Sequence, residues 1–218
     1  MSRSARLRIV LGLNAVLVGA LLVVALSAHS LGVLAEGVDF LADAAGIGVS
    51  LVAISLSKSP SSQRRPNGYP KATAIAALVN GGWLLVVSAL VAIASIGRLA
   101  TSTPEVNGLR VLVVSGIAAT VMLVGAFVLG LDTTRVEGGD EGGDLNMRAI
   151  LLDTAGDAAA AGGVAVAGAV ILATRSWFWV DPATALIISL VVGTRAAQLL
   201  RRVAQVLRPG DRVRQSTR

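Results

Sequence analysis

Six apolar stretches, each long enough to cross a bilayer as a helix, constrain the fold of this chain more than any other feature. The hydrocarbon layer is about 30 Å thick, which about 20 helical residues span. Hydrophobic residues make up 54% of the sequence and charged residues 15%, a composition typical of membrane proteins. The sequence therefore predicts an all-α membrane protein with six transmembrane helices. The predicted helices lie at about 9–28, 31–57, 73–96, 106–131, 147–174 and 182–206.

The distribution of basic residues predicts the orientation, because lysine and arginine favour the cytoplasmic side of a membrane. The termini and inner connections would carry Arg3, Arg6, Arg8, Lys58, Arg64, Arg65, Lys71, Arg135, Arg148, Arg201, Arg202, Arg208, Arg212, Arg214 and Arg218. The outer connections carry Arg98, Arg110 and Arg175, while Arg195 falls inside the sixth helix. We expect a multi-pass cell-membrane protein with both termini cytoplasmic.

The domain organisation follows from the same reading. Residues 1–208 form one six-helix transmembrane domain, and residues 209–218 form a short basic cytoplasmic tail. Orientation and contact with anionic lipid explain the net charge of +6, so no nucleic-acid partner is expected. An enzyme is not expected either, since the sequence shows no Ser-His-Asp arrangement, no cysteine and no phosphate-binding loop.

Two pairs of aspartates lie inside apolar helices with the same spacing. Asp39 and Asp43 belong to the second helix, and Asp153 and Asp157 to the fifth. Residues four apart share one face of a helix. An ionisable residue at membrane depth costs about 2.5 to 3.5 kcal/mol, so such residues are functional by default. The four carboxylates are the predicted ligands of one divalent-cation site.

Other polar residues near these helices leave alternatives open. Glu36 shares a face with Asp39 and either serves as an exit-path carboxylate or is a solvated residue at the cavity mouth. His29 is interpreted as a turn residue, with a metal role as the alternative. Asp181, before Pro182, is interpreted as the cap of the sixth helix. The apolar parts of the second and fifth helices offer the aspartates no basic partner, which disfavours ion pairing for packing.

Four segments of the chain resemble the cation diffusion facilitator family of divalent-metal transporters. They are 29–43, 68–81, 145–171 and 177–182. The second contains Gly68-Tyr69 before the third helix and Asn80-Gly81 within it, although Thr73 stands where the family usually has an acid. The third carries Asp153 where the family usually has histidine. The resemblance runs in order from about Asn14 to Arg202.

The resemblance implies a metal-cation/proton antiporter that exports divalent transition metal from the cytoplasm, with metal as substrate and no cofactor. An all-carboxylate ligand set favours manganese or iron(II), whereas the surrounding motifs resemble zinc exporters. Zinc and manganese both remain candidates. The alternative is a non-transporting truncated homologue that regulates or dimerises with a full-length transporter.

Two departures from the family bear on assembly. Family members commonly carry a soluble domain after the sixth helix, and this chain is expected to lack it. Its loop between helices four and five is acidic and contains no histidine. Without those elements, a homodimer would form through the membrane helices. Small residues permit close helix approach, and the third helix has a candidate stripe at Ala77, Gly81, Ser88, Ala92 and Ser95. This stripe either forms the dimer surface or packs against helices of the same chain.

Overall fold

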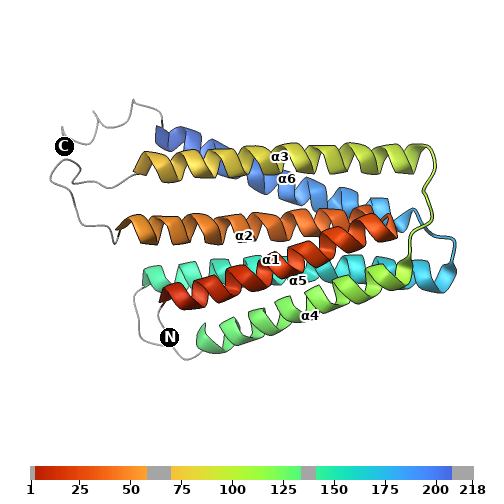
Figure 1. Ribbon diagram of the computed structural model, residues 1–218, viewed down its shortest axis with the longest axis horizontal. Coiled ribbons are helices and arrows are strands. Elements are labelled where there is room, and N and C mark those ends of the chain that lie inside the picture. Colours follow the sequence, from red (N-terminus) through yellow and green to blue (C-terminus); the bar gives the residue numbers. More distant parts are fainter. Residues whose placement is uncertain (1–2, 58–69, 134–140, 208–218) are drawn as a thin grey trace.

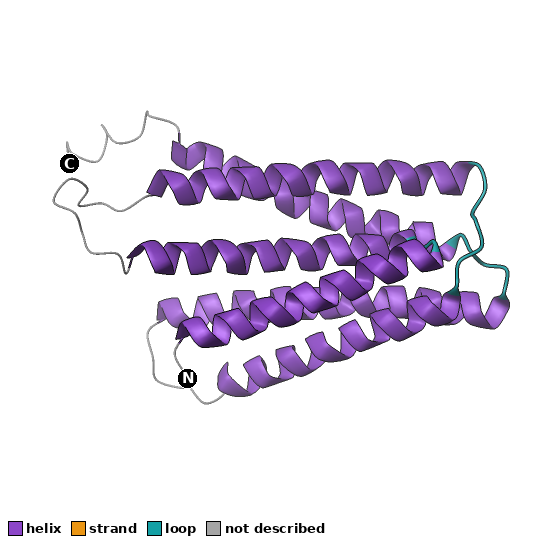
Figure 2. Cartoon of the chain, in the orientation of Figure 1, coloured by secondary structure: helices purple, strands orange, loops and turns teal. Residues whose placement is uncertain are grey.

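The computed structural model describes residues 3–57, 70–133 and 141–207. The described residues form six helices, which confirms the predicted fold class (Figures 1 and 2). They are α1 (Arg3–Ala28), α2 (Leu31–Ser57), α3 (Pro70–Ala100), α4 (Gly108–Thr133), α5 (Glu141–Thr174) and α6 (Val180–Leu207). By length and composition, three described segments could cross a membrane: Leu78–Ala100, Thr154–Thr174 and Val180–Gln205. Shorter apolar helical segments lie at Ala15–Ala28 and Gly108–Val124.

The helices form an elongated antiparallel bundle with α2 at its centre (Figure 1). The start of α1 and the end of α6 lie at one end. The connections at 29–30, 101–107 and 175–179 lie at the other, which we call the outer end. The most extensive packing joins α4 to α5 and α3 to α6, while α2 packs against α1, α3, α5 and α6. The core includes Phe40 and Leu21, whereas large side chains such as Leu90 and Ile93 are exposed, as lipid contact requires.

Two arginines at the outer end bind the carboxyl end of α1. Arg98 Nη1 donates to the His29 carbonyl oxygen at 2.7 Å, and Arg110 Nη1 donates to that of Ser27 at 2.9 Å. The backbone amide of Asn107 donates to the Ala28 carbonyl at 3.2 Å. The last carbonyls of a helix lack partners within it and carry partial negative charge. Arg98 and Arg110 therefore have a structural role, since they cap the carboxyl end of α1.

The backbones of α4 and α5 approach closely at two glycines. A Cβ atom on Gly168 would lie 2.6 Å from the backbone nitrogen of Leu112 and 3.0 Å from the carbonyl oxygen of Gly108. A Cβ atom on Gly108 would lie 2.7 Å from the Gly168 carbonyl oxygen. These neighbours are backbone atoms and cannot move aside as a side chain can. The glycines therefore set the α4–α5 distance.

Replacing Gly168 with alanine should force α4 away from α5 and lower the free energy of unfolding by about 1 to 3 kcal/mol, the usual cost of overpacking. Thermal unfolding in detergent, followed by circular dichroism, measures this loss. Gly163→Ala on the same helix is the matched control, because nothing lies within 4 Å of a Cβ atom there. Equal melting temperatures for the two variants would show that the close approach does not matter.

Two members of the small-residue stripe of α3, Gly81 and Ser88, pack against α6, which agrees with the alternative that the stripe packs against helices of the same chain. Ser88 and Ser95 are buried. A Cβ atom on Gly81 would lie 3.2 Å from Leu200 Cδ2, and one on Gly193 would lie 3.5 Å from Ser88 Cβ. Small residues permit close approach to any helix, and here that helix belongs to the same chain. A homodimer through other membrane-helix surfaces stays a prediction.

Candidate metal site

The two aspartates of α2 lie on the side of the helix that faces the interior of the bundle. Asp39 is buried, with 8% of its surface exposed, and Asp43, one turn further along the helix, is half-buried. Phe40 and Val38 beside them are core residues. Two carboxylates thus lie on one face of the central helix. Burying a negative charge in an apolar core costs much free energy unless a cation or a proton neutralises it.

The second pair belongs to α5. Asp157 is buried, with 5% of its surface exposed, among small core residues that include Ala158 and Ala161. Asp153 lies one turn earlier in α5, and its side chain falls outside the described residues. Thr154, between the two aspartates, is half-buried.

A close approach of α2 to α5 near the outer end indicates their relative register. A Cβ atom on Gly32 would lie 3.4 Å from Val164 Cγ1. The helices run in opposite directions from this point, because α2 begins and α5 ends at the outer end. Seven residues inward, or about 10 Å, bring α2 to Asp39 and α5 to Asp157. Seven residues also make two turns, so both aspartates share the face of the contacting residue.

The same register places the other two aspartates level with each other. Four residues further inward lie Asp43 on α2 and Asp153 on α5. The four residues therefore belong to two successive layers of the bundle, with one residue from each helix in each layer. The structure describes no cluster of three or more His, Asp or Glu side chains suited to a metal ion within the residues whose side chains it covers. Asp39, Asp43 and Asp157 are among those residues and do not form such a cluster, whereas Asp153 is not among them.

An arginine from α6 forms an ion pair with Asp157. Arg195 Nη1 lies 3.4 Å from Asp157 Oδ1. A Cβ atom on Gly156 would lie 3.0 Å from Arg195 Nη2, so the glycine leaves room for the guanidinium group. The expectation that Asp157 has no basic partner is therefore wrong, because the partner comes from a different helix, 38 residues away.

Glu36 is buried and is joined to α4 by a hydrogen bond. It is 1% exposed, and Ser115 Oγ on α4 donates a hydrogen bond to its Oε2 atom. Its Oε1 atom is buried and has no hydrogen-bond partner among the described residues. The alternative that Glu36 is a solvated residue at a cavity mouth is wrong, since the side chain is buried. Whether Glu36 lies on an exit path stays a prediction.

Asp181 caps α2 rather than its own helix. Its carboxylate accepts hydrogen bonds from Ser30 Oγ, from the Leu31 amide at 2.8 Å and from the Gly32 amide at 3.2 Å. It lies in the first turn of α6 and is 1% exposed. The interpretation of Asp181 as the α6 cap is therefore wrong. The negative charge still meets a helix N-terminus, where it is favoured, but the helix belongs to a distant part of the sequence.

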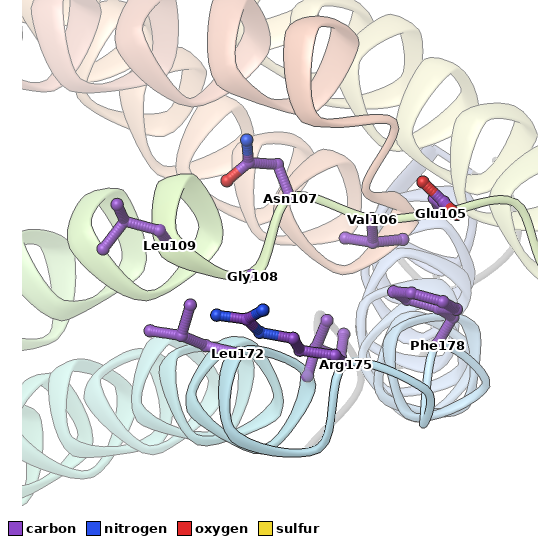
Figure 3. A pocket seen from close by; sticks show the side chains of 9 residues that line it. Glu105, Val106, Asn107, Gly108, Leu109, Leu172, Arg175 and Phe178 are labelled. Atoms are coloured by element: carbon purple, nitrogen blue, oxygen red, sulfur yellow. The ribbon is translucent and has the colours of Figure 1, made fainter.

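His29 lies away from the aspartates, in the turn between α1 and α2. It is exposed and has a left-handed backbone with φ of 56°, and its carbonyl oxygen accepts the Arg98 hydrogen bond. These features agree with the interpretation as a turn residue. A groove of about 310 Å³ also lies at the outer end, between the start of α4 and the end of α5 (Figure 3). Its lining includes Asn107, Arg175 and Phe178 and none of the aspartates.

Six helices with apolar exteriors and acids in the interior define a multi-pass membrane protein with ionisable groups inside the bundle. The chain belongs to the cation efflux family, a transporter family whose transmembrane domain matches residues 7–208. This match confirms the resemblance to cation diffusion facilitators. It covers all six helices apart from the first residues of α1.

Individual relatives include transporters of known name. The chain is 31% identical to the zinc transporter ZitB of Escherichia coli over 173 residues, which are 79% of this chain and 52% of that protein. It is 28% identical to the metal cation efflux system protein CzcD of Cupriavidus metallidurans over 204 residues, 94% of this chain and 61% of that protein. It is 27% identical to the human proton-coupled zinc antiporter SLC30A2 over 190 residues, 84% of this chain and 50% of that protein. The chain spans about half the length of most of these relatives.

Proposed function

We propose that this chain is the transport domain of a divalent transition-metal cation/proton antiporter that exports metal from the cytoplasm. Family membership supports metal transport. The printed names of relatives support efflux and proton coupling, since they include a metal cation efflux protein and a proton-coupled zinc antiporter. The start of α1 and the end of α6 lie at one end of the bundle, which agrees with two cytoplasmic termini.

The metal ligands in this proposal are Asp39, Asp43, Asp153 and Asp157. The observation that carries the assignment is the α2–α5 register, which brings the two aspartate pairs to the same two levels of the bundle. Carboxylate oxygens bind either metal or protons, so metal binding expels protons and protonation expels metal. Because the ligands come from two helices, relative movement of α2 and α5 would open the site to one side or the other.

Zinc is the proposed principal substrate. Relatives are named for zinc, cadmium and cobalt. Aspartate can bind zinc tetrahedrally, and the general affinity order of divalent metals places zinc above manganese and iron(II). Four hard oxygen ligands reduce this advantage, so manganese and iron(II) are the competing ions against which selectivity is measured.

Proteoliposomes that contain the chain and a pH-sensitive dye test the proposal. Zinc added outside should acidify the outer solution, because metal moving inward is exchanged for protons moving outward. Manganese should give a smaller response at the same concentration. Zinc binding without proton movement would contradict antiport and favour the alternative of a non-transporting regulatory subunit. Absence of zinc binding would contradict the site itself.

A further inference from the structure

Arg195 stands out because it brings a fixed positive charge to a carboxylate that the proposed function assigns to a metal. Its guanidinium is 3.4 Å from Asp157 Oδ1. The Asp157 side chain is only 7% exposed, so the arginine neutralises a carboxylate that water reaches poorly. Burial makes such compensation valuable, because an isolated charge in an apolar interior is very costly.

The position of the guanidinium depends on the absence of a side chain on α5. A Cβ atom on Gly156 would lie only 3.0 Å from Arg195 Nη2. The residue before Asp157 therefore forms a recess for the arginine. This second contact shows that the charge is seated against α5 and is not merely nearby.

A divalent cation and the guanidinium compete for the negative charge of Asp157. Two positive charges within a few ångströms repel strongly, above all where water is scarce. The arginine can leave, because 44% of its side chain is exposed and its long apolar stem allows the charged end to move toward the nearer membrane interface.

We propose that Arg195 is a tethered counter-cation that occupies Asp157 in the metal-free protein and is displaced by the transported divalent cation. The inference rests on the proposed function and deepens it. Arg195 would act as an internal competitor, which weakens metal binding and favours metal release. It acts through Asp157, and no contact of its own with the metal is required.

Metal titration of the purified chain by calorimetry, with zinc chloride as the probe, tests the inference. Arg195→Gln should lower the zinc dissociation constant about tenfold, in the usual range for two competing ligands. Arg195→Lys keeps the charge and should stay closer to the unmodified protein than Arg195→Gln does. Arg201→Gln on the same helix is the matched control, since Arg201 is exposed, and it should leave the constant unchanged.

A second variant keeps the test valid if Arg195→Gln does not fold. Gly156→Ala should shift the guanidinium beside Asp157 by a few tenths of an ångström while retaining every charge, so its effect should be smaller than that of Arg195→Gln. Alanine also favours a helix more than glycine does. This variant should also lower the zinc dissociation constant. Tighter binding in this variant supports displacement, whereas unchanged or weaker binding in both Gly156→Ala and Arg195→Gln overturns it.

Asp157→Asn separates failure of this inference from failure of the proposed function. Loss of zinc binding in Asp157→Asn, together with unchanged binding in Arg195→Gln, leaves the proposed site in place and overturns the counter-cation. Unchanged binding in Asp157→Asn contradicts the proposed ligand set. It also overturns the inference, because the ion pair would then serve packing alone.

Discussion

Replacing Asp43 with alanine is expected to abolish zinc-driven proton movement in proteoliposomes, and the same result is expected for Asp157→Ala. Each change removes one of four proposed ligands, and the two come from different helices and different layers of the bundle. Three carboxylates cannot replace the hydration shell of the metal as four can, and the lost carboxylate no longer carries a proton back. The measured quantity is the initial rate of pH change after zinc addition, which should fall to that of protein-free liposomes.

Glu105→Ala is the matched control for these variants, since it removes an exposed acid at the outer end of the bundle. It should retain the rate of the unmodified protein. A normal rate in either aspartate variant, with equal amounts of reconstituted protein, would remove that residue from the site.

Asp181→Ala should lower the free energy of unfolding by about 3 kcal/mol, because several buried hydrogen-bond donors would lose their acceptor. The donors are Ser30 Oγ and the amides of Leu31 and Gly32 at the start of α2. Loss of a helix cap alone costs about 1 kcal/mol, and here the cap also joins α2 to α6. Denaturant unfolding in mixed micelles, followed by circular dichroism, measures the change.

Asp181→Asn provides the graded comparison, because the amide keeps one acceptor oxygen but loses the charge. Its stability should lie between those of the unmodified protein and Asp181→Ala. If Asp181→Ala unfolds at the same denaturant concentration as the unmodified protein, the α2 cap does not contribute to the free energy of unfolding.

The fold could be predicted from the sequence because apolar length alone identifies membrane helices. For α2, the apolar pattern continues from the turn at Ser30 to the polar residues after Ser57. The start of α5 was harder to place. Apolarity begins near Met147, whereas the helix begins at Glu141, since a polar glycine-rich segment can continue a helix beyond the membrane. Hydropathy identifies which part of a helix is apolar, but it does not identify the residues at which the helix begins and ends.

The aspartate pairs could be predicted because four-residue spacing is a property of one helix. The partners of Asp157, Glu36 and Asp181 could not, since each comes from another helix far away in the sequence. Arg195 gave one usable signal, a lone charge within an apolar span, but no rule of spacing indicates which residue it contacts. The neighbour of the α3 stripe could not be predicted for the same reason. Small residues indicate close packing without identifying the helix that packs against them.

The two most extensively packed helix pairs form two units of the bundle that carry different members of the site, and the α1–α2 pair contacts both units. The α4–α5 pair, whose spacing the two glycines fix, carries Asp157, and the α3–α6 pair carries Arg195. A rotation of the α4–α5 pair against the α3–α6 pair would change the distance between Arg195 and Asp157. Asp153 and Asp157 would keep their spacing, because they share a helix. The distance across the ion pair therefore reports the relative position of the α4–α5 and α3–α6 pairs. A pair of spectroscopic labels, one on each side of it, would measure that motion directly.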